Sequence, residues 1–161
     1  MKIRIQTEPF DVGAELRAMS ADRTDIGAIA CFEGLCRDHH PGESAPGEVQ
    51  AMELEHYPGM TERAIADMVR QAQGRWPLLD VTVIHRVGRL LPADGIVLVL
   101  VASAHRAAAF AACEFLMDFL KTQAPFWKKE STAEGGRWVD ARESDDAALR
   151  RWGVDSDNAA I

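Results

Sequence analysis

The chain has 161 residues, 47% of them apolar, which is enough for one domain to bury a core without disulfides or a structural metal. Its formal net charge of −7 argues against a nucleic-acid-binding surface, because a phosphate backbone is normally met by a basic face. Any anion site is therefore expected to be local, with a few cations in a cleft that bind a small phosphorylated ligand. No apolar run approaches the roughly 20 residues of a membrane span, and the N-terminus lacks the apolar segment of a signal peptide, so we expect a cytoplasmic protein.

Apolar periodicity in the N-terminal half predicts an α+β fold, with strands where apolar and polar residues alternate and helices where apolar residues recur every three or four positions. The predicted strands span residues 2–7, 26–35 and 49–56. A short helix is predicted to begin at Asp11, and a longer one to span residues 58–76. Residues 38–48 are rich in proline and glycine, which predicts a mobile loop directly after Arg37.

The C-terminal half continues the α+β pattern. Strands are predicted over residues 81–87 and 96–102, with a turn at Asp94-Gly95 between them. Ser103 is a candidate N-cap for a long helix from about His105 to Thr122. The apolar face of this helix predicts that it is the central core helix, and its members are Phe110, Cys113, Met117 and Leu120.

The last predicted elements are a hairpin and a short helix. The hairpin combines residues 126–131 with residues 137–140, around an Ala-Glu-Gly-Gly turn. Ser144 is a candidate cap for a helix that ends at Trp152. The sequence therefore predicts a single domain over residues 1–152, followed by a flexible tail over residues 153–161.

The cysteines and histidines do not predict a metal site. The three cysteines match no zinc or Cys-x-x-Cys redox spacing, and His39 and His40 are adjacent rather than at helical metal spacing. Cys113 lies on a predicted apolar helix face, and Cys36 is expected in a core or strand position although Arg37 follows it. We assign neither thiol any chemistry.

The segment from Leu120 to Glu130 places three lysines around an aromatic pair and a proline. Pro125 ends the helix, so Lys121 is expected on its last turn and Lys128 on the following strand or loop. Their amines can then converge, and because close cations disfavour each other's charged form, one of them could serve as a base or nucleophile. The alternative is a lysine that favours the helix dipole, followed by a solvated lysine pair.

Two histidine–arginine pairs are weaker candidates. His105 and Arg106 follow a strand and open a helix, where the first-turn amides already favour an anion such as phosphate. Exposed residues without a ligand are the alternative for this pair. His85 and Arg86 end another strand and could lie at an interface or at the edge of the core.

Six short blocks of the chain form a further pattern, and they are Phe32-Glu-Gly-Leu-Cys-Arg37, Leu54-Glu-His-Tyr-Pro-Gly-Met60, His85-Arg-Val-Gly88, Ser103-Ala-His-Arg106, Leu120-Lys-Thr-Gln-Ala-Pro-Phe-Trp-Lys128 and Gly136-Arg-Trp138. In their order and spacing, from about residue 26 to residue 152, they resemble the large, catalytic subunits of molybdopterin synthase. The chain departs from the family in a longer loop after Arg37, and in Cys36 where an aliphatic residue is expected.

The resemblance implies an α/β hammerhead fold with an additional antiparallel β subdomain, in a homodimer flanked by two small ubiquitin-like subunits. Each small subunit would thread its C-terminal Gly-Gly tail, ending as a thiocarboxylate, into a pocket of this chain. Sulfur would pass to cyclic pyranopterin monophosphate to form the dithiolene of molybdopterin. No cofactor is implied, because the partner protein supplies the sulfur.

Carried over by motif, the resemblance makes Lys121 and Lys128 the catalytic pair. Lys121 is favoured as the proton-transfer group and Lys128 as the positioning charge. Arg37 and the pair His105 and Arg106 would bind the phosphate and pterin, with the latter two supplied by the other protomer.

Three apolar residues are expected to line the pocket, namely Phe32, Met117 and Trp127, although core packing explains them as well. Two further functions stay open beside the enzyme. One is a noncatalytic scaffold that binds a ubiquitin-like partner through a tail groove. The other is a binder of small phosphorylated metabolites.

Overall fold

The computed structural model describes residues 1–38, 50–132, 135–139 and 150–153. The elements in chain order are β1 (Lys2–Gln6), α1 (Val12–Ser20), β2 (Ala28–Leu35), β3 (Ala51–His56), α2 (Met60–Arg75), β4 (Leu78–Arg86), β5 (Gly88–Leu90), β6 (Gly95–Ser103), α3 (Arg106–Thr122), β7 (Phe126–Thr132) and β8 (Gly135–Val139). The predicted α+β fold class is confirmed, and the elements form two four-stranded sheets.

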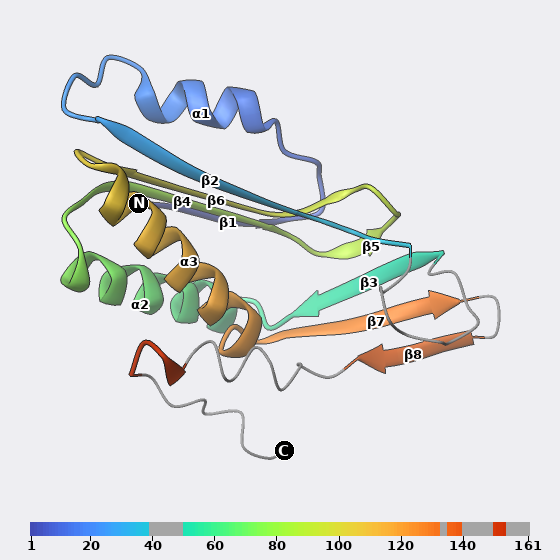
Figure 1. Cartoon of the computed structure of the whole chain (residues 1–161). Coiled ribbons are helices and arrows are strands. Elements are labelled where there is room, and N and C mark those ends of the chain that lie inside the picture. Colours follow the sequence, from blue (N-terminus) through green and yellow to red (C-terminus); the bar gives the residue numbers. More distant parts are fainter. Residues whose placement is uncertain (39–49, 133–134, 140–149, 154–161) are drawn as a thin grey trace.

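The first sheet has the strand order β1-β4-β6-β2 and is covered on both faces. Figure 1 shows α1 on one face and α2 and α3 on the other. In the central strand β6, Val97, Val99 and Val101 belong to the core beneath α2 and α3. The intervening Leu98 and Leu100 pack on the α1 side. Burial on both faces explains why this strand has a continuous apolar run rather than an alternating one.

Helix α3 is the central core helix, as the sequence predicts. Phe115 and Leu116 on its inner face are completely buried. Two predictions about this helix are wrong. Phe110 is not a core residue but is 66% exposed, because it lies at the edge of the apolar face. The N-cap is His105 rather than Ser103, whose hydroxyl lies in β6 and donates a hydrogen bond to the carbonyl of Pro77 at 2.9 Å.

The second sheet has the order β5-β3-β7-β8 and extends from one end of the first (Figure 1). The predicted hairpin is confirmed in β7 and β8. Strand β5 was not expected, since three residues are too few to show an alternating pattern. It pairs with β3, and Gly88, at φ +81°, allows the chain to turn into it directly after β4.

The core position expected for Cys36 and Cys113 is confirmed. Cys36 is buried with Met52, Leu54 and Leu90 beneath the second sheet. Burial raises the pKa of the Cys113 thiol to about 11.

Some predictions fall outside the described residues. These are the helix start at Ser144, the loop at 38–48 beyond Asp38, and the tail beyond Gly153. In the part of the chain that is described, no helix is long and apolar enough to cross a bilayer.

Candidate functional site

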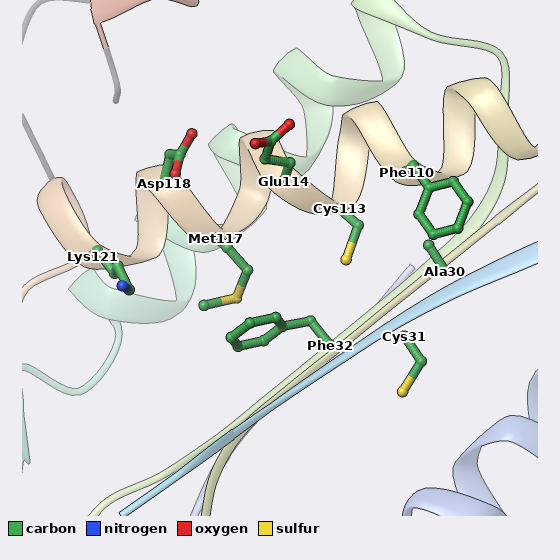
Figure 2. Close-up of a pocket in the computed structure, with 9 residues that line it drawn as sticks. All are labelled: Ala30, Cys31, Phe32, Phe110, Cys113, Glu114, Met117, Asp118 and Lys121. Carbon is green, nitrogen blue, oxygen red and sulfur yellow. The ribbon is translucent and has the colours of Figure 1, made fainter. Parts of the chain in front are cut away.

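A pocket of about 360 Å³ lies between α3 and β2, an edge strand of the first sheet (Figure 2). Its lining residues on α3 share one helix face, since they are spaced three or four residues apart, and they are Phe110, Cys113, Glu114, Met117, Asp118 and Lys121. Strand β2 contributes Ala30, Cys31 and Phe32. The pocket is therefore a groove that follows the helix for about three turns.

The wall of this groove is apolar. Figure 2 shows the side chains of Phe32 and Met117 pointing toward each other from β2 and α3. Phe32 is 38% exposed and Phe110 is more exposed still, whereas Met117 is buried. A ligand in the groove would cover these two aromatic rings, and burial of apolar surface favours binding by about 25 cal/mol per Å².

Lys121 lies at one end of the groove, on the last turn of α3. Lys128 is the third residue of β7, where its register partners are Leu54 in β3 and Val139 in β8. The predicted placement of the two lysines on the helix end and on the following strand is therefore confirmed. Among the described residues, the lining of the groove includes Lys121 but not Lys128.

Two acidic residues form the rim of the groove beside Lys121. Glu114 and Asp118 each accept a hydrogen bond from Arg151 at 2.7 Å. The indole N–H of Trp152 also donates to Asp118 at 2.7 Å. The hydrogen bond from Arg151 to Asp118 is the main cause that raises the pKa of the Arg151 guanidinium, and the bond to Glu114 is the next. Arg151 and Trp152 thus bind the rim, a contact that the sequence did not predict.

His105 and Arg106 are exposed at the opposite end of α3. Lys121 is 15 positions after Arg106, which at 1.5 Å per residue is about 22 Å along the helix. One small ligand cannot contact both residues within a single chain.

Arg37 and Trp127 lie outside the groove lining of the described chain. Arg37 is exposed just beyond β2, and the preceding residue is fixed by two backbone hydrogen bonds of 2.8 Å, from Cys36 to Asp94 and from Ala93 to Cys36. Trp127 is 46% exposed on β7, opposite Glu55.

His85 and Arg86 are buried, so of the two alternatives for this pair the structure has the core-edge position. The His85 ring stacks on Phe126 with 3.9 Å between ring centroids. Burial lowers the pKa of His85 to about 4. Arg86 donates hydrogen bonds to the carbonyls of Thr7 and Gly95, at 3.2 and 3.1 Å.

Among the described residues, no group of three or more His, Cys, Asp or Glu side chains is arranged to hold a metal ion.

Comparisons with solved structures place this fold among known ones. A MoaE protein from Burkholderia ambifaria superposes with a TM-score of 0.80 and 58% identity, covering 96% of this chain and 99% of that one. A molybdopterin synthase structure from Staphylococcus aureus has a TM-score of 0.76 at 28% identity, over 85% of this chain and 96% of that one. A chain in a complex of subunits 1 and 2 of molybdopterin-converting factor from Helicobacter pylori shares the fold, with a TM-score of 0.68 at 19% identity over 88% of this chain and 90% of that one.

Sequence comparisons give the same relationship. A molybdopterin synthase catalytic subunit from Ralstonia nicotianae is 60% identical over 98% of this chain and 88% of its own length. One from Escherichia coli is 55% identical over 94% of this chain and 97% of its own length. The family described as MoaE protein matches residues 5–123. The resemblance on the six sequence blocks is therefore confirmed, and the chain belongs to the MoaE protein family.

Proposed function

We propose that the chain is the catalytic subunit of a molybdopterin synthase. It transfers sulfur from the C-terminal thiocarboxylate of a small ubiquitin-like subunit to cyclic pyranopterin monophosphate, and two transfers make the dithiolene of molybdopterin. The observation that supports this most directly is the apolar groove between α3 and β2, which has a lysine at one end.

The shape of the groove suits an extended peptide tail. From Phe110 to Lys121 the helix rises about 16 Å, which matches four or five residues of extended chain at 3.3 Å each. Glycine residues at the end of the tail can approach Phe32 and Met117 closely because they have no side chain. Its terminal carbonyl then lies near the Lys121 amine.

The two lysines divide the chemistry. Lys121 is the proton-transfer group at the reacting centre, where a positioned side chain contributes about 10²- to 10⁴-fold. Lys128 stays charged and stabilises negative charge on the substrate or on the acyl intermediate as sulfur leaves. The thiocarboxylate sulfur bonds to a carbon of the precursor and displaces an oxygen from it, to which Lys121 gives a proton. Water then cleaves the acyl–sulfur bond of this intermediate, so the sulfur stays on the substrate and the tail departs as a carboxylate.

The anion-binding residues complete the site from two protomers. Arg37 contacts the phosphate of the precursor, and His105 and Arg106 of a second copy approach from the partner's α3. A two-fold dimer allows this, because an isologous interface brings the start of one helix near the end of the other and repeats the contact twice. Met117 lines the pocket with Phe32, and Trp127 flanks Lys128 on β7.

The assembly is a homodimer with one small subunit on each side, located in the cytoplasm. The complex of subunits 1 and 2 in the related Helicobacter pylori fold supports a small protein partner. The chain needs no cofactor of its own, since sulfur arrives on the small subunit.

The experiment mixes the purified chain with thiocarboxylated small subunit and cyclic pyranopterin monophosphate, and measures dithiolene product. Lys121→Ala is expected to lower turnover at least 100-fold while the small subunit still binds, because a lysine at a helix end contributes little to folding. Lys129→Ala is the matched control, since this lysine is next to Lys128 in β7 but points to the opposite face of the strand.

Other outcomes would identify a different function. A stable complex with the small subunit but no product from the wild type would indicate a noncatalytic scaffold. Binding of phosphorylated metabolites with no effect of the small subunit would indicate a metabolite binder. Near-normal turnover by Lys121→Ala would remove that residue from the catalytic pair.

A further inference from the structure

The placement of the two lysines depends on a short connection. Lys121 is on α3, which packs on the first sheet, whereas Lys128 is on β7 of the second sheet. Only residues 123–125 lie between these elements. Whatever fixes the conformation of this connection therefore sets how the two amines face each other.

Thr61 contacts the connection from a distant part of the sequence. Its side chain is completely buried in the first turn of α2, and its hydroxyl oxygen lies 3.2 Å from the carbonyl oxygen of Pro125. Figure 1 shows that α2 begins beside the place where α3 ends and β7 begins. The hydroxyl thus joins the helical layer of the first sheet to the strand that carries Lys128.

The hydroxyl proton has two candidate acceptors, the carbonyls of Pro125 and Tyr57, at 3.2 and 3.1 Å. The Tyr57 carbonyl already accepts the amide hydrogens of Met60 and Thr61, at 3.1 and 3.0 Å. A carbonyl oxygen has two lone pairs, so these two amides occupy it. The Tyr57 amide in turn donates to the Thr61 hydroxyl at 3.2 Å, which leaves the hydroxyl proton for Pro125.

A second contact holds the same connection from its other end. The amide of Phe126 donates to the carbonyl of Ala124 at 2.8 Å, which closes a tight turn around Pro125. The Phe126 ring stacks on the buried His85 ring, with an angle of 17° between the planes. The stack fixes the first residue of β7, and the Thr61 bond fixes the carbonyl just before it.

We propose that Thr61 is a positioning residue for the lysine pair. Through the Pro125 carbonyl, it holds β7 against α3 at the spacing that lets Lys121 and Lys128 act on one substrate. This inference rests on the proposed function, because it assumes that the two lysines work together.

The test compares three variants in the sulfur-transfer assay. Thr61→Val keeps the shape of the side chain but loses the hydroxyl, whereas Thr61→Ser keeps the hydroxyl. Thr82→Val is the matched control, since Thr82 is also buried but lies in β4, paired with Lys2 and Leu100. A misplacement of about 1 Å in an active site costs on the order of 100-fold in rate, so Thr61→Val is expected to lower kcat by 10- to 100-fold.

Binding constants, together with the activity of the serine variant, distinguish a positioning role of Thr61 from a role in folding. For Thr61→Val, KM for the precursor and Kd for the small subunit are expected to stay within about twofold of wild type, because no substrate contact is removed. Thr61→Ser is expected to restore kcat. Thr82→Val is expected to keep wild-type kcat when rates are compared per folded protein.

Hydrogen exchange gives a readout that does not depend on turnover. Thr61→Val is expected to speed exchange of the Phe126 amide, since the turn around Pro125 loses its tertiary anchor, and Thr82→Val is not. Unchanged kcat in Thr61→Val, equal kcat losses in Thr61→Val and Thr82→Val, or no rescue by serine would each overturn the inference. Wild-type turnover by Lys121→Ala would instead refute the catalytic pair itself, and the inference would fall with it.

Discussion

Replacement of His85 should change how the stability of the protein depends on pH. The ring is buried against Phe126, and its Nδ1 lies 2.8 Å from the carbonyl of Arg86. A carbonyl only accepts hydrogen bonds, so Nδ1 carries the proton of the neutral ring and donates it. Burial lowers the pKa of His85 from 6.5 to about 4, so the folded protein resists protonation there.

The sign and size of the effect follow from proton linkage. Between pH 6.5 and 4 the unfolded chain binds a proton at this histidine and the folded chain does not, so stability falls as the pH is lowered through this range. The stability from the neutral ring is fully present above pH 6.5. The loss amounts to about 2 kcal/mol at pH 5 and about 3 kcal/mol at pH 4, below which it levels off.

The assay is urea denaturation of wild type and of two variants, His85→Phe and His85→Leu, at several values of pH from 4 to 8. Carboxylates elsewhere titrate in all three proteins, so they cancel in the difference between wild type and variant. The phenylalanine keeps a stacking ring and the leucine does not, so their offsets at pH 8 should differ. For both variants, the free energy of unfolding relative to wild type should nevertheless rise by about 3 kcal/mol between pH 8 and pH 4. Parallel stability curves for all three proteins would refute the reasoning.

Three further predictions concern the dimer, the substrate and the C-terminal segment. Lys121→Ala and Arg106→Ala homodimers should each be inactive, but refolding them together should restore about a quarter of wild-type activity, because half the dimers are mixed and each has one intact site; no recovery, with mixed dimers verified by mass spectrometry, would place the site within one chain. Arg37→Ala should weaken binding of the precursor more than binding of the small subunit, as titration calorimetry would measure, since a guanidinium that binds phosphate is lost; equal losses would put Arg37 in the tail subsite. Trp152→Ala should lower the free energy of unfolding by about 2 kcal/mol, because its ring packs against the rings of Trp76 and Phe115, whereas the exposed Trp127→Ala should cost less than about 1 kcal/mol. Similar costs in urea denaturation would contradict that packing.

Much of the fold could be predicted because burial of one face of a strand or helix leaves a regular spacing of apolar residues in the sequence. Alternation identified β1 and β3, and an apolar run with turn residues before it identified β6. Strand β5 could not be found, because its pairing with β3 depends on contacts between distant segments. The cap of α3 was misplaced by two residues. The Ser103 hydroxyl donates to the Pro77 carbonyl across the fold, and it accepts the amide of His105, the N-cap itself, rather than an amide of the first helical turn.

The candidate site was predicted in part, and mainly through family resemblance. Phe32, Met117 and Lys121 line one groove, but periodicity alone could not separate a groove from a core, and so Phe110 was assigned to the core. The acidic rim lies on the same face of α3, and its spacing was available in the sequence. Its bonds to Arg151 depend on the chain returning to this helix, which no local pattern reports.

The α3 helix also limits how the length of this chain can change. One inserted residue within a helix rotates everything after it by about 100° and moves it by 1.5 Å along the axis. An insertion between Arg106 and Lys121 would turn the lysine away from β2 while the sheet beneath stayed in place. Two whole turns would restore the face but would lengthen the helix by about 11 Å, and Lys121 would move by the same distance relative to β2. Substitutions along the groove are thus compatible with the fold in a way that insertions are not. A change in length is better tolerated before the helix than in residues 123–125, which set the spacing of Lys121 and Lys128.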